Sequence, residues 1–101
     1  MAKNKLNKEL DIYATLAGLK SAVDVQEFLV DLCTPSELRA LSERWRVAQL
    51  VNKGTSYRQI NEETGVSTTT VTRVARILED GVGYRKILDG MTKNTVERVS
   101  K

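Results

Sequence analysis

Histidine is absent from the 101 residues of this chain, and cysteine and proline occur once each. Without histidine, the Ser-His and Cys-His pairs that activate nucleophiles cannot form, and the commonest metal ligand is missing. A zinc site needs about four ligands, so Cys33 alone cannot build one, and we expect it to be a small buried residue. We therefore expect no enzymatic activity, no metal site and no cofactor.

Long apolar runs and a glycine-rich phosphate loop are also missing. No apolar stretch reaches the roughly 18 residues that a membrane span needs. Residues 1–8 are polar and lack the apolar core of a signal peptide. The chain has a single cysteine, so no intramolecular disulfide can form. The absence of disulfides is typical of a protein in a reducing compartment. These absences predict a cytoplasmic protein without a membrane partner.

Helix-breaking residues are scarce, since the chain has one proline and six glycines, and aromatic residues make up only 5%. The composition therefore predicts an all-α fold, and the length predicts a single domain over residues 1–101. We expect N-terminal dimerisation helices over 7–54, a helix-turn-helix over 55–80, and a short helix and tail over 81–101. Dimerisation would add apolar burial to a small core.

Two helices are predicted before the proline. The first runs from about Asn7 to Ala17 and is interrupted by Gly18, and Ser21 caps the second. Each helix has an apolar stripe at helical spacing. The two stripes consist of Leu10, Tyr13, Ala14 and Ala17, and of Val25, Phe28, Leu29 and Leu32.

A third, longer helix is predicted to start at the proline. Thr34 caps it, Pro35 suits its first position, and Glu37 completes a capping box. It runs to Lys53, and Gly54 ends it in the left-handed conformation. Its apolar face consists of Leu38, Leu41, Trp45, Ala48 and Val51. The tryptophan lies on this stripe, so we expect it in the core or a dimer interface rather than stacked on bases.

Two capped helices joined by a glycine turn form the most informative part of the sequence. A short helix over 57–64, capped by Ser56, ends at Gly65, and Ser67 caps a second helix over about 68–80. Two helices joined by a turn of about three residues are typical of the helix-turn-helix. The predicted buried seam consists of Ile60, Val66, Val71, Val74 and Leu78. After Gly81 we expect one more short helix, from Tyr84 to Asp89, which Gly90 ends.

The outer face of the second of these helices is rich in hydroxyl and guanidinium groups. Short hydroxyl side chains let a helix enter the major groove, and threonine can donate, accept or contact a thymine methyl. Arginine pairs with guanine or with phosphate. The predicted DNA-binding residues are Lys53, Arg58, Ser67, Thr68, Thr69, Thr72, Arg73 and Arg76. Of the basic residues, Lys53, Arg46 and Arg76 are expected to contact mainly phosphate.

The charge distribution agrees with this interpretation. The net charge of the chain is only +3, but residues 44–76 contain six basic and two acidic residues, a net charge of +4. Residues 1–43 contain five basic and seven acidic residues, a net charge of −2. Basic groups near a DNA backbone release condensed counterions, so the concentration of positive charge in the central segment favours duplex DNA as the partner.

Two stretches of the sequence have a distinctive order of motifs: L-C-T-P-S-E-L-R-A-L-S-E-R-W-R-V at 32–47 and N-K-G-T-S-Y-R-Q-I-N-E-E-T-G-V-S-T-T-T-V-T-R at 52–73. Through them, the segment from Leu32 to Leu88 resembles the Trp-repressor family, and most closely its TrpR-like YerC/YecD group. The resemblance implies an intertwined, all-helical homodimer in which the N-terminal helices of two chains interlock. The two reading helices of such a dimer lie about 34 Å apart, one turn of DNA.

The resemblance also implies a possible effector pocket, because the repressor grips tryptophan with two arginines. The residues at the matching positions are Thr34, Arg44 and Arg73. However, Val74 replaces the family's glycine and Ile77 replaces its serine, and the turn is one residue shorter. These changes add bulk or remove a hydroxyl at the ligand's position, so we expect no tryptophan binding. Arg44 is then expected to form a surface ion pair with Glu43 or a neighbour.

The sequence as a whole predicts a sequence-specific regulator of transcription, a repressor acting by occlusion, that reads the major groove with a helix-turn-helix. The alternative is a helix-turn-helix module that binds protein and does not bind DNA. The dependence of DNA affinity on salt separates the two, because phosphate contacts weaken steeply as salt rises.

Overall fold

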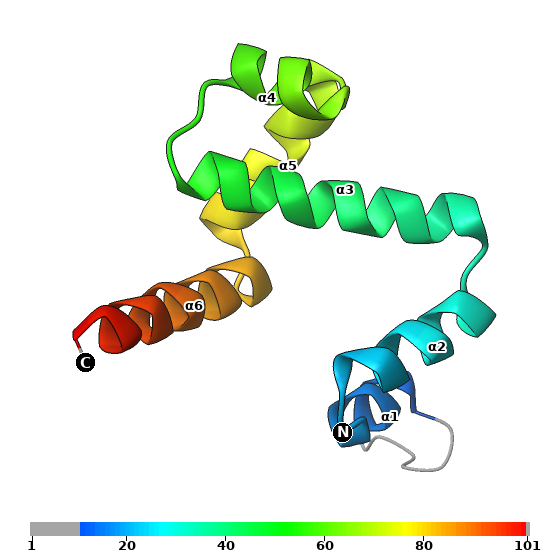
Figure 1. Cartoon of the computed structure of the whole chain (residues 1–101). Coiled ribbons are helices and arrows are strands. Elements are labelled where there is room, and N and C mark those ends of the chain that lie inside the picture. The colour runs from blue at the N-terminus through cyan, green and yellow to red at the C-terminus, as the bar shows by residue number, and fades with distance from the viewer. Residues whose placement is uncertain (1–10, 101) are drawn as a thin grey trace. The chain divides into compact units, whose positions relative to one another are not determined.

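The computed structural model describes residues 11–100, and the side chains of residues 11–91. Six helices and no strand occupy this part of the chain, so the all-α prediction is confirmed (Figure 1). The chain divides into two compact units, Met1–Leu38 and Arg39–Lys101. One domain over 1–101 remains a prediction. No helix within residues 11–100 has the length and hydropathy required to cross a membrane.

In the first unit, α1 (Ile12–Gly18) begins later than expected. Asp11 has an extended backbone and caps the helix, and its side chain accepts a hydrogen bond from the Tyr13 N–H at 2.9 Å. The predicted start at Asn7 lies outside the described residues, but the extended backbone of Asp11 shows that the predicted helix is not continuous through that position. Gly18 is the last residue of α1 rather than an interruption. Leu10 of the predicted stripe lies outside the described residues.

The second helix, α2 (Ala22–Leu32), is capped as predicted. The Ser21 hydroxyl accepts a hydrogen bond from the Asp24 N–H at 3.1 Å. Neither α1 nor α2 buries a single residue fully. Large apolar side chains of the first unit are instead exposed, and Tyr13 is 70% exposed. The others in this unit are Ile12, Val23, Val30 and Leu32.

The long helix α3 (Pro35–Asn52) starts at the predicted capping box. The Thr34 N–H donates to Glu37 Oε1 at 2.9 Å, and the Glu37 N–H donates to Thr34 Oγ1 at 3.1 Å. These two bonds satisfy backbone groups that a helix start otherwise leaves unpaired. At the other end, Gly54 adopts φ 88°, the left-handed conformation predicted for it.

The core lies in the second unit, where α4 (Tyr57–Thr64) and α5 (Thr68–Asp80) pack on the C-terminal part of α3 (Figure 1). The bounds of both helices match the prediction. Every residue of the predicted seam is buried, and the core cluster consists of Val47, Ala48, Ile60, Val66, Val71 and Val74. The prediction missed Val47, which is fully buried. Val47 is adjacent to Ala48 in the sequence, so the buried face of α3 is wider than the predicted apolar stripe.

The last helix, α6 (Gly83–Ser100), is longer than the expected Tyr84–Asp89 segment. Gly90 was expected to end it but lies inside it. Its φ is not in the left-handed range that a terminating glycine adopts, and glycine in a helix interior costs only about 1 kcal/mol. Leu88 is buried, and Tyr84 stacks on Trp45 with ring centroids 6.0 Å apart.

Candidate nucleic-acid interface

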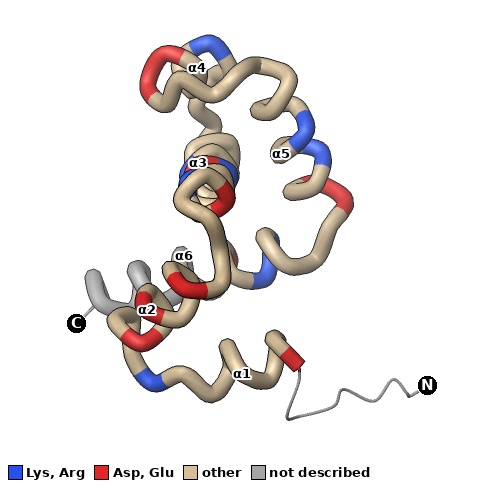
Figure 2. Tube along the Cα trace, turned by 90° about the vertical axis from the view of Figure 1, so that its right-hand side faces the viewer, with Lys and Arg blue, Asp and Glu red and all other residues tan. Residues whose placement is uncertain are grey.

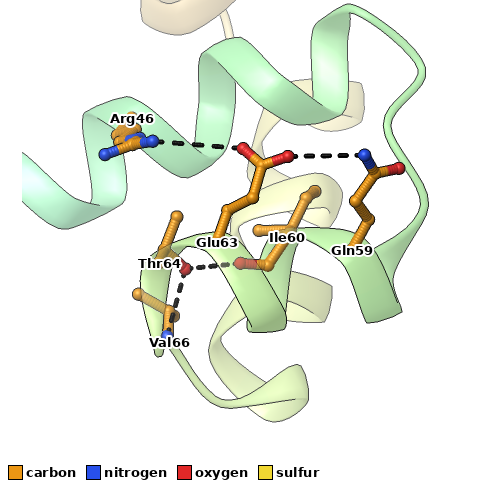
Figure 3. Close-up of polar contacts among 6 residues, drawn as sticks. All are labelled: Arg46, Gln59, Ile60, Glu63, Thr64 and Val66. Carbon is orange, nitrogen blue, oxygen red and sulfur yellow. Dashed lines mark hydrogen bonds and ion pairs between the residues drawn. The ribbon is translucent and has the colours of Figure 1, made fainter.

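The turn between α4 and α5 is fixed by its backbone and by two polar side chains. Gly65 adopts φ 76° and its N–H donates to the Asn61 carbonyl at 2.8 Å. The Thr64 hydroxyl donates to the Ile60 carbonyl at 2.7 Å and accepts from the Val66 N–H at 3.1 Å (Figure 3). Asn61 Nδ2 donates to the Val66 carbonyl at 2.8 Å.

The sequence predicts the glycine of this turn but not the roles of Asn61 and Thr64. Both side chains lie in the last helical turn of α4 and bond to backbone groups of the connection between α4 and α5. Short polar residues just before a terminating glycine are the signal that could have indicated them, because such side chains bond readily to nearby backbone groups. Together they set the angle at which α5 leaves α4.

The rotation of α5 about its own axis is set by its apolar face. Val71, Val74 and Leu78 are almost completely buried, as the seam predicted. The opposite face is consequently exposed. All eight predicted DNA-binding residues are exposed: Lys53, Arg58, Ser67, Thr68, Thr69, Thr72, Arg73 and Arg76. The second unit therefore presents a polar helix face of the kind that enters a major groove.

The hydroxyl groups of this face differ in how far they are already engaged. Ser67 accepts from the Thr70 N–H and donates to Thr70 Oγ1, both at 3.2 Å. Thr72 donates its hydroxyl proton to the Thr68 carbonyl at 2.9 Å. Within residues 11–91, the hydroxyls of Thr68 and Thr69 make no hydrogen bond. These two hydroxyls are therefore available to a ligand, whereas the Ser67 hydroxyl caps α5.

The arginine side chains likewise differ in whether they are already paired with a carboxylate. Arg58 Nε lies 3.3 Å from Glu62 Oε2, in a pair whose arginine side chain is 89% exposed. Arg46 lies 4.0 Å from Glu63, which also accepts from Gln59 at 3.4 Å (Figure 3). Exposed pairs contribute only about 0–1 kcal/mol, so a phosphate can replace either carboxylate.

Arg73 forms no ion pair with any described residue, and neither does Arg76. Figure 2 shows the basic positions of α5 in blue, after an uncharged first turn. This first turn consists of Thr68, Thr69 and Thr70. Helix α5 thus combines uncharged hydroxyl groups at its start with two arginines further along that have no ion pair among the described residues.

The residues of the possible effector pocket are not assembled within one unit. Thr34 belongs to the first unit, where its hydroxyl caps α3. Arg44 lines a cavity of about 310 Å³ beside the turn, with Glu43 and Ser67 among the neighbours. Arg73 lines a different cavity of about 390 Å³ together with Arg76 and others. Arg44 makes no ion pair with Glu43 or with another described residue, so that expectation is wrong.

The two residues of the possible effector pocket that differ from the family pattern lie in different environments. Val74 is buried in the core seam, so its extra bulk relative to glycine is used in packing α5. Ile77 is 46% exposed and lines an apolar cavity of about 500 Å³ with Trp45, Gly83, Tyr84 and Ile87. Trp45 also packs against the core cluster, as predicted for it.

Residues 11–91 contain no group of three or more histidine, cysteine, aspartate and glutamate side chains that could hold a metal ion. Cys33 is a free thiol and is half-buried rather than buried in the single chain. It follows Leu32, the last residue of α2, and its N–H donates to the Leu29 carbonyl at 2.9 Å. Its backbone thus completes the C-terminal end of α2.

The chain matches known proteins in both sequence and fold. The Trp repressor protein family matches residues 8–92. The protein YerC of Bacillus subtilis (strain 168) is 38% identical over 96 residues, which cover 93% of this chain and 92% of YerC. The crystal structure of a TrpR-like protein from Eubacterium eligens ATCC 27750 is 31% identical, covers 91% of this chain and 96% of that chain, and gives a TM-score of 0.79.

The chain therefore belongs to the Trp repressor family, a family of all-α helix-turn-helix proteins. Within that family, its similarity to YerC and to the TrpR-like protein places it in the TrpR-like YerC group. The resemblance noted in the sequence is thereby confirmed.

Proposed function

We propose that this protein is a sequence-specific, duplex-DNA-binding regulator of transcription that represses by occluding its site. The observation that supports this most is the orientation of α5. Its valine face is buried, while Thr68, Thr69 and Arg73 are exposed on the other side. Membership in the Trp repressor family supports the same function, and a DNA-binding role agrees with a cytoplasmic, non-enzymatic protein.

We assign the contacts by the chemistry of each side chain. Thr68, Thr69 and Thr72 contact base edges and thymine methyls, and Arg73 and Arg58 pair with guanine. Lys53, Arg46 and Arg76 contact phosphate, which positions the protein without reading sequence. Ser67 contributes indirectly, because its hydroxyl caps the helix whose N-terminus faces the DNA.

The proposed protein is a homodimer. The support is the absence of any fully buried residue in α1 and α2, together with the exposed Val23, Val30 and Leu32 on α2. A helix with an apolar stripe needs another surface to cover it. A second copy would supply that surface and would place two reading helices about one turn of DNA apart.

Tryptophan is not proposed as an effector. Val74 fills the core where a ligand would need the space of a glycine, and Ile77 offers no hydroxyl. Calorimetry with L-tryptophan tests this, and micromolar binding would overturn it.

The function is tested by selecting binding sites from random duplex DNA. We expect a palindromic consensus, because a twofold-symmetric dimer binds two related half-sites. Arg73→Ala should then lose about 1–3 kcal/mol of binding free energy on the selected duplex and less on random DNA. Lys20→Ala, an equal charge change in the first unit, should affect both duplexes little. Equal losses on both duplexes for Arg73→Ala would make Arg73 a phosphate contact only.

The absence of duplex binding even at low salt would instead favour the alternative, a helix-turn-helix module that binds protein. In that case, the exposed face of α5 would remain available to a polypeptide partner.

A further inference from the structure

A polar cleft of about 430 Å³ lies beside the reading helix in the second unit. It is bounded by the end of α3, the start of α4, the middle of α5 and the start of α6. The polar residues that line it are Asn52, Tyr57, Thr72, Arg76, Glu79 and Arg85. Thr72 and Arg76 already belong to the proposed DNA surface, so the cleft continues that surface toward α6.

Arg85 is held in this cleft by two contacts. Its Nη1 donates to Asn52 Oδ1 of α3 at 2.9 Å and lies 3.6 Å from Asp89 Oδ1 of its own helix. Both contacts use the same nitrogen, which leaves the Nε and Nη2 donors of the guanidinium without a partner among the described residues. The side chain is 46% exposed, so these donors remain accessible to a ligand.

The second guanidinium of the cleft, Arg76, has no ion pair in the described part of the chain. Two guanidiniums that share a cleft favour a ligand with several acceptor oxygens, because each planar group can give two parallel hydrogen bonds to a phosphate. The phenol of Tyr57 adds another possible donor. Glu79, which lines the cleft, and Asp89, which lies 3.6 Å from Arg85, both oppose an anion, so a phosphate competes with two exposed carboxylates for the two guanidiniums.

We propose that this cleft, which we call the Arg76–Arg85 cleft, binds a phosphate group, and, resting on the function proposed above, that the group is a backbone phosphate of bound DNA. Arg85 is then a DNA contact that α6 contributes from outside the helix-turn-helix. Asn52 acts as a positioning residue, because it orients Arg85 and does not itself need to reach the ligand.

The test compares two adjacent residues of α6. Arg85→Gln and Lys86→Gln remove the same charge, but only Arg85 lines the cleft, while Lys86 is exposed elsewhere. Arg85→Gln should weaken binding roughly tenfold, to a similar extent on selected and random duplexes, and should lower the salt slope by about 1. Lys86→Gln should have a much smaller effect. Equal effects of the two variants would overturn the proposal.

Two further variants separate a phosphate contact from damage to the fold. Arg85→Lys keeps the charge but lacks the planar fork, so it should recover only part of the lost affinity. Glu79→Gln removes the opposing charge and should tighten DNA binding. If the cleft had a purely structural role, Glu79→Gln would not tighten DNA binding. An unchanged DNA affinity of this variant would therefore count against the proposal.

A final experiment distinguishes a backbone phosphate of DNA from free inorganic phosphate as the ligand of the cleft. If the wild-type protein bound no duplex, the proposed function would fail, and inorganic phosphate would then be titrated with NMR detection of the Arg76 and Arg85 signals. Shifts that disappear in Arg85→Gln would retain the cleft as a site for free phosphate. An absence of shifts, together with an absence of duplex binding, would overturn the phosphate cleft as well.

Discussion

The hydroxyl oxygen of Thr64 accepts a hydrogen bond from the N–H of Val66 at 3.1 Å, across the glycine that separates the two helices of the helix-turn-helix. The same hydroxyl donates to the carbonyl of Ile60 at 2.7 Å. Val66 is only 8% exposed, so its N–H has little access to water. One side chain therefore satisfies a polar group at the point where the chain changes direction.

Replacing this hydroxyl should destabilise the fold. Thr64→Val keeps the shape but leaves the Val66 N–H unpaired, which should lower the free energy of unfolding by about 1–3 kcal/mol. Urea denaturation followed by circular dichroism measures this. The control is Thr69→Val, at an exposed position of α5, which should change stability by no more than about 0.5 kcal/mol. Equal stabilities for the two variants would show that the bond contributes nothing.

The glycine of the same turn should also resist substitution. A Cβ at Gly65 would contact nothing within 4 Å, but the residue adopts φ 76°. Gly65→Ala should therefore cost about 1 kcal/mol of stability through backbone strain alone, since only glycine visits this region freely. Gly65→Asn should cost less, because asparagine tolerates the left-handed conformation better. Thermal unfolding of the two variants would test this order.

Replacing Gly90 by alanine should stabilise the fold, unlike the same replacement at Gly65. Gly90 lies inside α6, and a Cβ there would meet nothing within 4 Å. Gly90→Ala should raise the free energy of unfolding by about 0.5–1 kcal/mol, because alanine loses less backbone entropy in a helix than glycine does. Destabilisation by this substitution would indicate that the helix ends at Gly90, as the sequence alone suggested.

The proposed dimer depends on the apolar side chains of α2. Val30 is 53% exposed in the single chain, so Val30→Glu would place a charge in the proposed interface. Analytical ultracentrifugation should show the wild type at twice the chain mass of 11.3 kDa and Val30→Glu shifted toward that mass. Thr69→Glu adds the same charge on the outer face of α5 and should remain a dimer. A monomeric wild type, or a Val30→Glu variant that stays dimeric, would contradict the assignment.

Much of the helix-turn-helix could be predicted from the sequence because its determinants are local. Ser56, Gly65 and Ser67 mark helix ends through their own side chains or backbone, and α4 and α5 have the predicted bounds. The buried seam followed from helical spacing, since residues three and four apart share a face. For the same reason, the exposure of Thr69 and Arg73 on the opposite face could be predicted.

The features that sequence reasoning missed depend on packing or on competing local signals. Val47 is buried because α3 packs over a wide arc, which a single stripe cannot indicate. Gly90 carries a termination signal, yet α6 continues through it. Arg85 was not among the predicted contacts because its position depends on Asn52, 33 residues away in the sequence. Non-local contacts of this kind become visible only in three dimensions.

We propose that the outer face of α5 enters the major groove, and the variant Thr69→Glu probes this contact at an exposed position of that face. Fluorescence anisotropy with the selected duplex would be measured for this variant and the wild type between roughly 50 and 200 mM salt, the range in which phosphate contacts weaken steeply. We predict that the wild type binds with a steep salt dependence and that the folded, dimeric variant loses sequence-specific binding. Equal affinity of the two proteins for the selected duplex would contradict the claim.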